Sequence, residues 1–114
     1  MSGITPHARA DIIGILLTSE DRFGRRVRDG YEELIVAAMD AVADDPARVG
    51  VQERSELGVG IRAWHLRLSR GSVPVDVHRI ITPRHVVFFR EVNGEVQILR
   101  VLHESMDLPG QRYE

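Results

Sequence analysis

The stretch Arg84–His103, RHVVFFREVNGEVQILRVLH, contains a complete structural unit in itself. Near its centre lies Asn93-Gly94, the dipeptide that a two-residue type I′ turn favours, because both central residues of that turn need positive φ. Apolar residues with high β-propensity flank the dipeptide on both sides. The stretch therefore predicts a β-hairpin against which the rest of the chain has to pack.

A two-residue loop fixes which residues of the two strands lie opposite each other. The expected pairs are Val92 with Glu95, Phe89 with Ile98, Phe88 with Leu99, Val87 with Arg100 and Val86 with Val101. Because side chains alternate along a strand, one face should carry Val87, Phe89, Val96, Ile98 and Leu102, and the other Val86, Phe88, Leu99 and Val101. Both faces are apolar. Helices elsewhere in the chain can cover one face, so we expect another molecule to cover the second.

Length and composition indicate one globular domain spanning residues 1–114. The chain is 43% hydrophobic and 28% charged. It has no cysteine, which excludes disulfides, thiolate metal sites and a cysteine nucleophile, and favours a reducing compartment. It also has no long apolar run and no signal-like N-terminus. We therefore expect a soluble, cytoplasmic protein that does not associate with membranes.

The basic residues are all arginines. Lysine is absent, and the formal net charge is −2. Arginine favours planar, bidentate pairing with carboxylates, so an acidic peptide partner would suit this surface. A near-neutral balance argues against a general nucleic-acid binder, and we expect no direct binding of nucleic acid by this chain.

Two amphipathic helices are expected ahead of the hairpin. Thr5 is a good N-cap, Pro6 is tolerated in a first helical turn, and Gly24 should end the first helix. Apolar residues recur at helical spacing in both segments: Ala8, Ile12, Ile15 and Leu16 in the first, and Val27, Tyr31, Leu34, Ile35, Ala38 and Val42 in the second. Asp44-Asp45-Pro46 should stop the second helix. Phe23-Gly24 thus joins an αα-hairpin.

The segment between the helices and the hairpin is less regular. Residues 47–60 are polar and without period, which indicates a loop. Ile61–Arg70 fits both a helical stripe and a strand alternation, and we favour a short helix. Val75–Ile81 predicts a strand that turns back into the hairpin. Together the elements predict an α+β fold, with a short N-terminal strand and an αα-hairpin packed on a small, mainly antiparallel sheet that ends in a β-meander.

Ordered motifs run through most of the chain. In the N-terminal part they are Ile4-Thr5, Ala8, Asp11-Ile12, Ile15, Phe23-Gly24, Tyr31, Ile35 and Asp45-Pro46. In the C-terminal part they are more specific: PRHVVFFR at 83–90, ILRVLH at 98–103 and SMDL at 105–108. The set resembles the RelE/ParE toxin family, and within it the ParE branch. This chain departs from the compact ParE proteins between Val51 and Pro83, where it is longer and carries Ile61–Arg70 as an insertion.

The resemblance implies a non-catalytic inhibitor without a cofactor. ParE proteins are toxin halves of bacterial type II toxin–antitoxin pairs, so a ParD-like antitoxin would hold this chain inactive. The C-terminal segment of that antitoxin would fold into apolar grooves and pair acidic residues with arginines. The implied target is DNA gyrase, poisoned by binding while DNA is cleaved. Two alternatives stay open: a ribosome-dependent mRNA endoribonuclease of the RelE type, and a relative that binds an antitoxin without being toxic.

Two sets of contact residues follow. We expect the antitoxin to contact Ile15, Tyr31, Trp64, Arg67, Arg84, Arg90 and Arg100. We expect the target to contact His85, His103 and Met106. For Tyr31 and Trp64, packing in the core is the alternative.

Arg100 needs an anion near it. The expected register places it beside Val87 on an apolar face, where an unpaired guanidinium would be costly. The antitoxin can supply the anion, and so can three candidates within the chain: Glu91, Glu104 and Asp107.

His103 invites a catalytic interpretation, since an imidazole near a strand end can act as a general acid or base. The expected register, however, places His85 and His103 on opposite faces. RelE-type ribonucleases resemble this hairpin but have basic residues where Val86 and Glu104 stand, although Tyr113 could supply their tail aromatic. We therefore expect a structural or partner-contacting His103. The histidines show no metal-ligand spacing, and we expect no metal.

Overall fold

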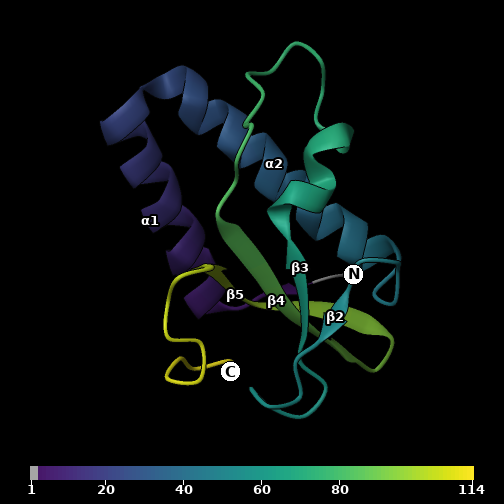
Figure 1. The fold of residues 1–114 in the computed structure, drawn as a ribbon. Helices are drawn as coiled ribbons and strands as arrows, with labels where there is room; N and C mark the ends of the chain where they lie inside the picture. Colours follow the sequence, from purple (N-terminus) through teal and green to yellow (C-terminus); the bar gives the residue numbers. More distant parts are fainter. Residues whose placement is uncertain (1–2) are drawn as a thin grey trace.

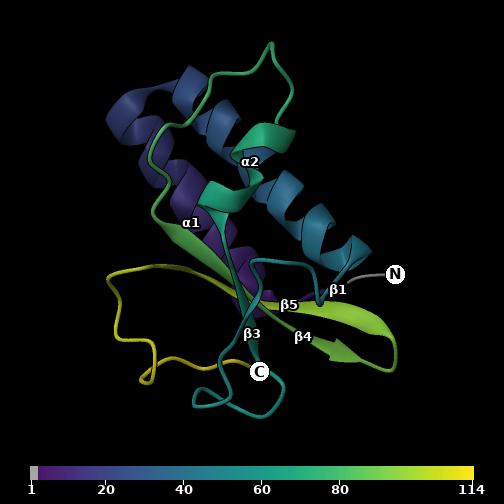
Figure 2. The ribbon, with the colours of Figure 1, turned by 45° about the vertical axis from the view of Figure 1, so that its right-hand side comes forward.

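The computed structural model describes residues 3–114. A five-stranded sheet in the order β1-β5-β4-β3-β2 carries two long helices on one side (Figures 1 and 2). In chain order the elements are β1 (Gly3–Ile4), α1 (Pro6–Phe23), α2 (Arg25–Asp44), β2 (Gln52–Glu53), β3 (Arg62–His65), the 3-10 helix η1 (Leu66–Ser72), β4 (His85–Val92) and β5 (Glu95–His103). Neighbouring strands are antiparallel except β1, which runs parallel to β5. The predicted α+β fold is confirmed.

The two helices begin and end where the sequence predicts. The side-chain oxygen of Thr5 accepts a hydrogen bond from the backbone N–H of Ala8 at 3.1 Å, and Pro6 occupies the first turn of α1. Gly24 alone separates α1 from α2 and has a φ of 89°. Glycine adopts that positive φ without a steric penalty, so the chain can reverse between the helices in one residue.

The turn of the β4–β5 hairpin is also as predicted. Asn93 and Gly94 have φ angles of 52° and 81°, and Val92 lies opposite Glu95. Positive φ at both central residues is what a type I′ turn requires. Local sequence therefore determines this end of the hairpin.

A β-bulge changes the register further from the turn. Phe89 pairs with Ile98 as expected, but Phe88 pairs with Arg100, so Leu99 is an extra residue in β5. The predicted pairs beyond this point are wrong, because a bulge shifts every later residue by one position. The observed pairs are Val87 with Val101, Val86 with Leu102 and His85 with His103. As a result Val101 packs on the helix side of the sheet and Leu102 on the far side.

Both faces of the sheet are buried by the chain itself. The helix-side cluster contains Ala8, Tyr31, Leu34, Ile35, Ala38, Val42, Trp64, Leu66, Val87, Phe89, Val96, Ile98 and Val101. The far-side cluster contains Ile61, Ala63, Phe88, Leu99, Leu102 and Tyr113. Phe88 and Leu99 have no exposed surface. The expectation that another molecule must cover the second face is therefore wrong.

Two segments without a strong sequence pattern supply that cover. The loop between β2 and β3 and the C-terminal tail both lie below the sheet, on the side away from the helices (Figure 2). The rings of Tyr113 and Phe88 form a T-shaped contact with a centroid distance of 5.4 Å, and the hydroxyl of Tyr113 donates to the backbone oxygen of Leu108 at 2.8 Å. A segment without regular secondary structure can bury apolar surface, but its sequence shows no helical or strand periodicity. Hydrophobic periodicity therefore does not predict this cover.

The segment between α2 and β4 differs from the prediction. Ile61–Arg70 is not a helix throughout, because Arg62–His65 forms β3 and only the part from Leu66 onward is helical. Val75–Ile81 forms no strand, since β3 already occupies the edge of β4 that this segment would need. Residues 47–60 form a loop, as predicted, apart from the short β2. Within residues 3–114, no helix has the length and apolar character to cross a membrane.

Candidate functional site

A groove of about 720 Å³ opens between α1, the first turns of α2 and the paired ends of β4 and β5. Its lining brings together residues that the sequence analysis placed in two separate contact sets: Ile15, Tyr31, Arg84, His85, His103 and Met106. Residues from both helices, both hairpin strands and the adjoining loops thus meet at one place. The groove is the candidate functional site.

The helical wall of the groove is rich in apolar side chains. Phe23 and Val27 line it near the junction of the two helices, and the side chain of Phe23 is 65% exposed. Ile13 and Leu17, 54% and 64% exposed, extend the apolar surface on α1 beyond the groove. Exposed apolar surface of this kind marks interaction sites on folded proteins.

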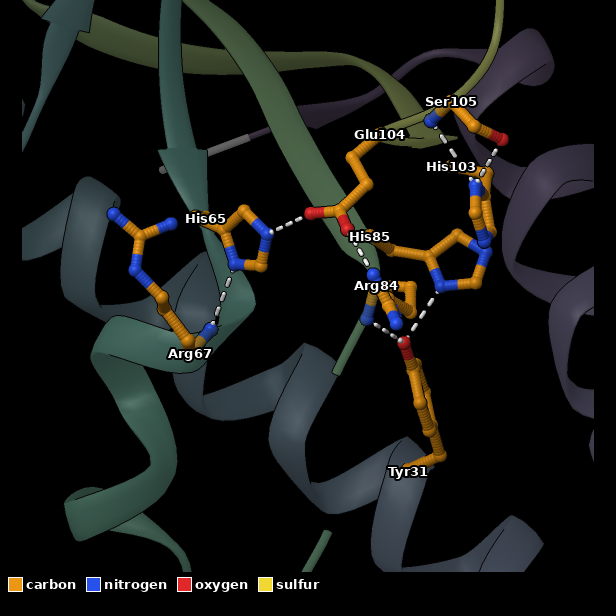
Figure 3. A network of polar contacts seen from close by, with 8 residues as sticks. All are labelled: Tyr31, His65, Arg67, Arg84, His85, His103, Glu104 and Ser105. Carbon is orange, nitrogen blue, oxygen red and sulfur yellow. Dashed lines mark hydrogen bonds and ion pairs between the residues drawn. The ribbon is translucent and has the colours of Figure 1, made fainter. Parts of the chain in front are cut away.

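Tyr31 on α2 is hydrogen-bonded to His85 at the start of β4. The phenol oxygen lies 2.6 Å from Nδ1 of His85, and it accepts the backbone N–H of Arg84 at 3.2 Å (Figure 3). Burial raises the pKa of Tyr31, which keeps the phenol protonated. Burial and the nearby His103 lower the pKa of His85 to about 4, so this imidazole is neutral near pH 7.

His103 lies directly across the hairpin from His85. The two ring centroids are 5.2 Å apart, with 85° between the ring planes. Nδ1 of His103 accepts the backbone N–H of Ser105 at 3.1 Å and lies 2.7 Å from its hydroxyl oxygen (Figure 3). The prediction that the two histidines lie on opposite faces is wrong, because the bulge at Leu99 moves His103 by one position.

Glu104, which directly follows β5, connects the ends of β3, β4 and β5 beside the histidine pair. Its carboxylate accepts hydrogen bonds from Nε2 of His65 at 2.7 Å and from the guanidinium of Arg84 at 2.8 Å (Figure 3). These two hydrogen bonds lower the pKa of Glu104 to about 2. Sequence reasoning missed His65, because nothing local indicates that residues so far apart in the chain come together.

Four residues predicted to contact the antitoxin lie outside the groove lining: Trp64, Arg67, Arg90 and Arg100. Trp64 is only 4% exposed and donates its indole N–H to the hydroxyl of Ser69 at 2.9 Å, so it is a core residue with little surface to offer. Arg67 is exposed on η1. Arg90 on β4 is half-buried, and its Nε has no hydrogen-bond partner within residues 3–114. Partner contacts by Arg67 and Arg90 stay predictions.

Arg100 is held by an acid within the chain. Its Nε and Nη2 donate to the two carboxylate oxygens of Asp11 at 2.7 and 2.9 Å, and the same carboxylate accepts the backbone N–H of Val101 at 3.0 Å. The side chains of Arg100 and Asp11 are 13% and 14% exposed. The required anion is therefore present, but it is none of the three candidates named from the sequence. An antitoxin contact by Arg100 stays a prediction.

Comparisons with known proteins agree with the resemblance seen in the motifs. The family model described as the ParE toxin of the type II toxin-antitoxin system, parDE, matches residues 4–108. Toxin ParE1 of Caulobacter vibrioides is 32% identical over 104 residues, which cover 91% of this chain and 88% of that protein. The match therefore extends across both helices and the whole hairpin, including every residue of the groove named above. This chain belongs to the ParE toxin family of type II toxin–antitoxin systems.

Proposed function

We propose that this chain is a non-enzymatic toxin that inhibits DNA gyrase by binding it, and that a ParD-like antitoxin neutralises it in the cytoplasm. Family membership implies an antitoxin partner. The groove supports this proposal, because it combines an apolar helical wall with arginine and histidine side chains. An acidic, amphipathic segment would place apolar side chains against Phe23 and Val27 and carboxylates near Arg84.

One observation carries the proposal beyond family membership. Three of the residues expected to contact the antitoxin, Ile15, Tyr31 and Arg84, line the same groove as the three expected to contact gyrase, His85, His103 and Met106. An antitoxin segment bound there would cover the residues proposed to contact gyrase. Neutralisation would then be a competition for one surface and would need no rearrangement of the toxin.

A supercoiling assay tests the proposal. Purified gyrase should lose supercoiling activity when this protein is added and regain it when the small protein encoded beside it is added as well. Phe23→Arg should prevent that rescue, because it places a charge in the apolar wall. Val75→Arg is the matched control, since Val75 is 99% exposed and lies outside the groove. Unchanged supercoiling, or growth arrest that the neighbouring protein does not relieve, would contradict the proposal.

The contact between His85 and His103 supports one alternative function, that of an endoribonuclease of the RelE type. Two adjacent imidazoles can share acid and base roles, and they do meet at the hairpin end. Ribosome-dependent cleavage of a transcript, lost in His103→Ala, would support this alternative. Gyrase inhibition by the unaltered chain, with no cleavage of the transcript, would support the main proposal.

A further inference from the structure

The hydrogen position on His85 is assigned from its hydrogen-bond neighbours. The oxygen of Tyr31 accepts the backbone N–H of Arg84, so its own hydrogen is available for Nδ1 of His85 at 2.6 Å. Nδ1 of His85 is then an acceptor, and a neutral imidazole carries its hydrogen on the other nitrogen. His85 therefore presents an Nε2–H donor.

The same reasoning applies to His103. The backbone N–H of Ser105 can only donate, and it points at Nδ1 of His103 at 3.1 Å. Nδ1 is an acceptor here too, so Nε2 carries a hydrogen. In Figure 3 the two rings lie side by side, with the nitrogens that make no drawn contact turned toward each other. Within residues 3–114 neither Nε2 has a hydrogen-bond acceptor.

The nearby carboxylates are already engaged. Asp11, which also lines the groove, is bound by Arg100 and by the backbone N–H of Val101. Glu104 is bound by His65 and Arg84. His85 and His103 both line the groove, and neither of these two carboxylates is free to accept from their Nε2–H groups. A carboxylate, with two oxygens and several lone pairs, can accept from both donors at once.

We infer that the Nε2–H groups of His85 and His103 form a binding site for a carboxylate, supplied by an acidic side chain of the antitoxin segment that occupies the groove. The identity of the occupant rests on the proposed function. The apolar helical wall favours a peptide over a nucleic acid as the source of the anion. A side-chain carboxylate also lets the peptide continue along the apolar wall on either side of the histidine pair.

Acetate tests the site without any partner. In a titration of the purified chain followed by ¹⁵N NMR of the imidazoles, acetate should shift the ring signals of His85 and His103 and leave those of His7 and His78 unchanged. Inorganic phosphate serves as the second probe. No shift at the pair with acetate, or a response to phosphate at much lower concentration than to acetate, would overturn the inference.

The occupant is tested with the small protein encoded beside this chain. His103→Leu should weaken its binding by about ten- to hundredfold, the usual worth of a hydrogen bond to a charged group. His103→Gln should recover part of the affinity, because its amide N–H reaches the position of Nε2. His78→Leu is the control. If His103→Leu binds the neighbouring protein with unchanged affinity, the assignment of the occupant is overturned. If the unaltered chain does not bind that protein at all, the proposed function is refuted, but the acetate result still stands.

Discussion

Asp11→Asn should destabilise the fold more than any exposed ion pair can account for. The carboxylate of Asp11 accepts from two nitrogens of Arg100 and from the backbone N–H of Val101, all within 3.0 Å. An asparagine has the same shape but replaces one acceptor oxygen by a donor NH₂ group. In either orientation of the amide, at least one N–H of Arg100 or Val101 faces another N–H. The substitution therefore leaves a largely buried guanidinium without its counter-charge.

The magnitude follows from how buried the pair is. Removing one partner of a buried ion pair typically destabilises a protein by about 3–5 kcal/mol. Arg100 keeps a hydrogen bond to the backbone oxygen of Arg112, and its side chain is 13% exposed, so we place the loss at the lower end of that range. A loss of about 3 kcal/mol is a large part of the roughly 5–15 kcal/mol that stabilises a domain.

Urea unfolding measures this loss. With a denaturant dependence of about 1–3 kcal/mol per molar, the midpoint should fall by roughly 1–3 M, and the melting temperature by about 10 °C. Asp29→Asn is the matched control, because Asp29 is 54% exposed beside Arg28 and its pair should contribute less than about 1 kcal/mol. Equal effects of the two substitutions would refute the reasoning. Combining Asp11→Asn with Arg100→Leu should recover part of the stability, since no charge is then left unpaired.

Three further outcomes are expected. Gly30→Ala should destabilise the fold by about 1–3 kcal/mol, because the added Cβ would overlap the backbone oxygen of His78. Gly14→Ala has open space around its Cβ and should stabilise α1 by about 0.5–1 kcal/mol. Thermal unfolding of both variants measures these opposite changes in stability. The pKa of His85 is the usual 6.5 in the unfolded chain and about 4 in the folded chain, so between these values the unfolded chain binds the extra proton. The contribution of His85 to the free energy of unfolding should therefore be complete above pH 6.5 and decrease as the pH is lowered to about 4. His85→Gln should flatten that part of a plot of urea midpoint against pH, and a midpoint that does not fall in the unaltered chain would contradict the burial argument. Tyr113→Ala should destabilise by about 3 kcal/mol and increase the binding of an apolar dye to the far side of the sheet, whereas Tyr113→Phe should lose about 1 kcal/mol at most.

Elements that depend on neighbours in sequence were predictable from the sequence. The cap at Thr5, the reversal at Gly24 and the turn at Asn93-Gly94 all appear where expected. Each is decided within a few residues, by a side chain that caps a backbone N–H or by a φ angle that only certain residues adopt cheaply. The motifs also indicated the family, and six of the residues expected to contact a partner line the groove.

The tertiary structure decided the rest. The bulge at Leu99 depends on how both faces of β5 pack, and no local pattern encodes it. That one residue places His103 against His85 and Val101 under the helices. The partner of Arg100 is likewise 89 residues away in the sequence. Residue types and spacing determine which helices and turns can form. The contacts between side chains across the sheet depend on how distant segments pack together and on which hydrogen-bond partners they bring to each other.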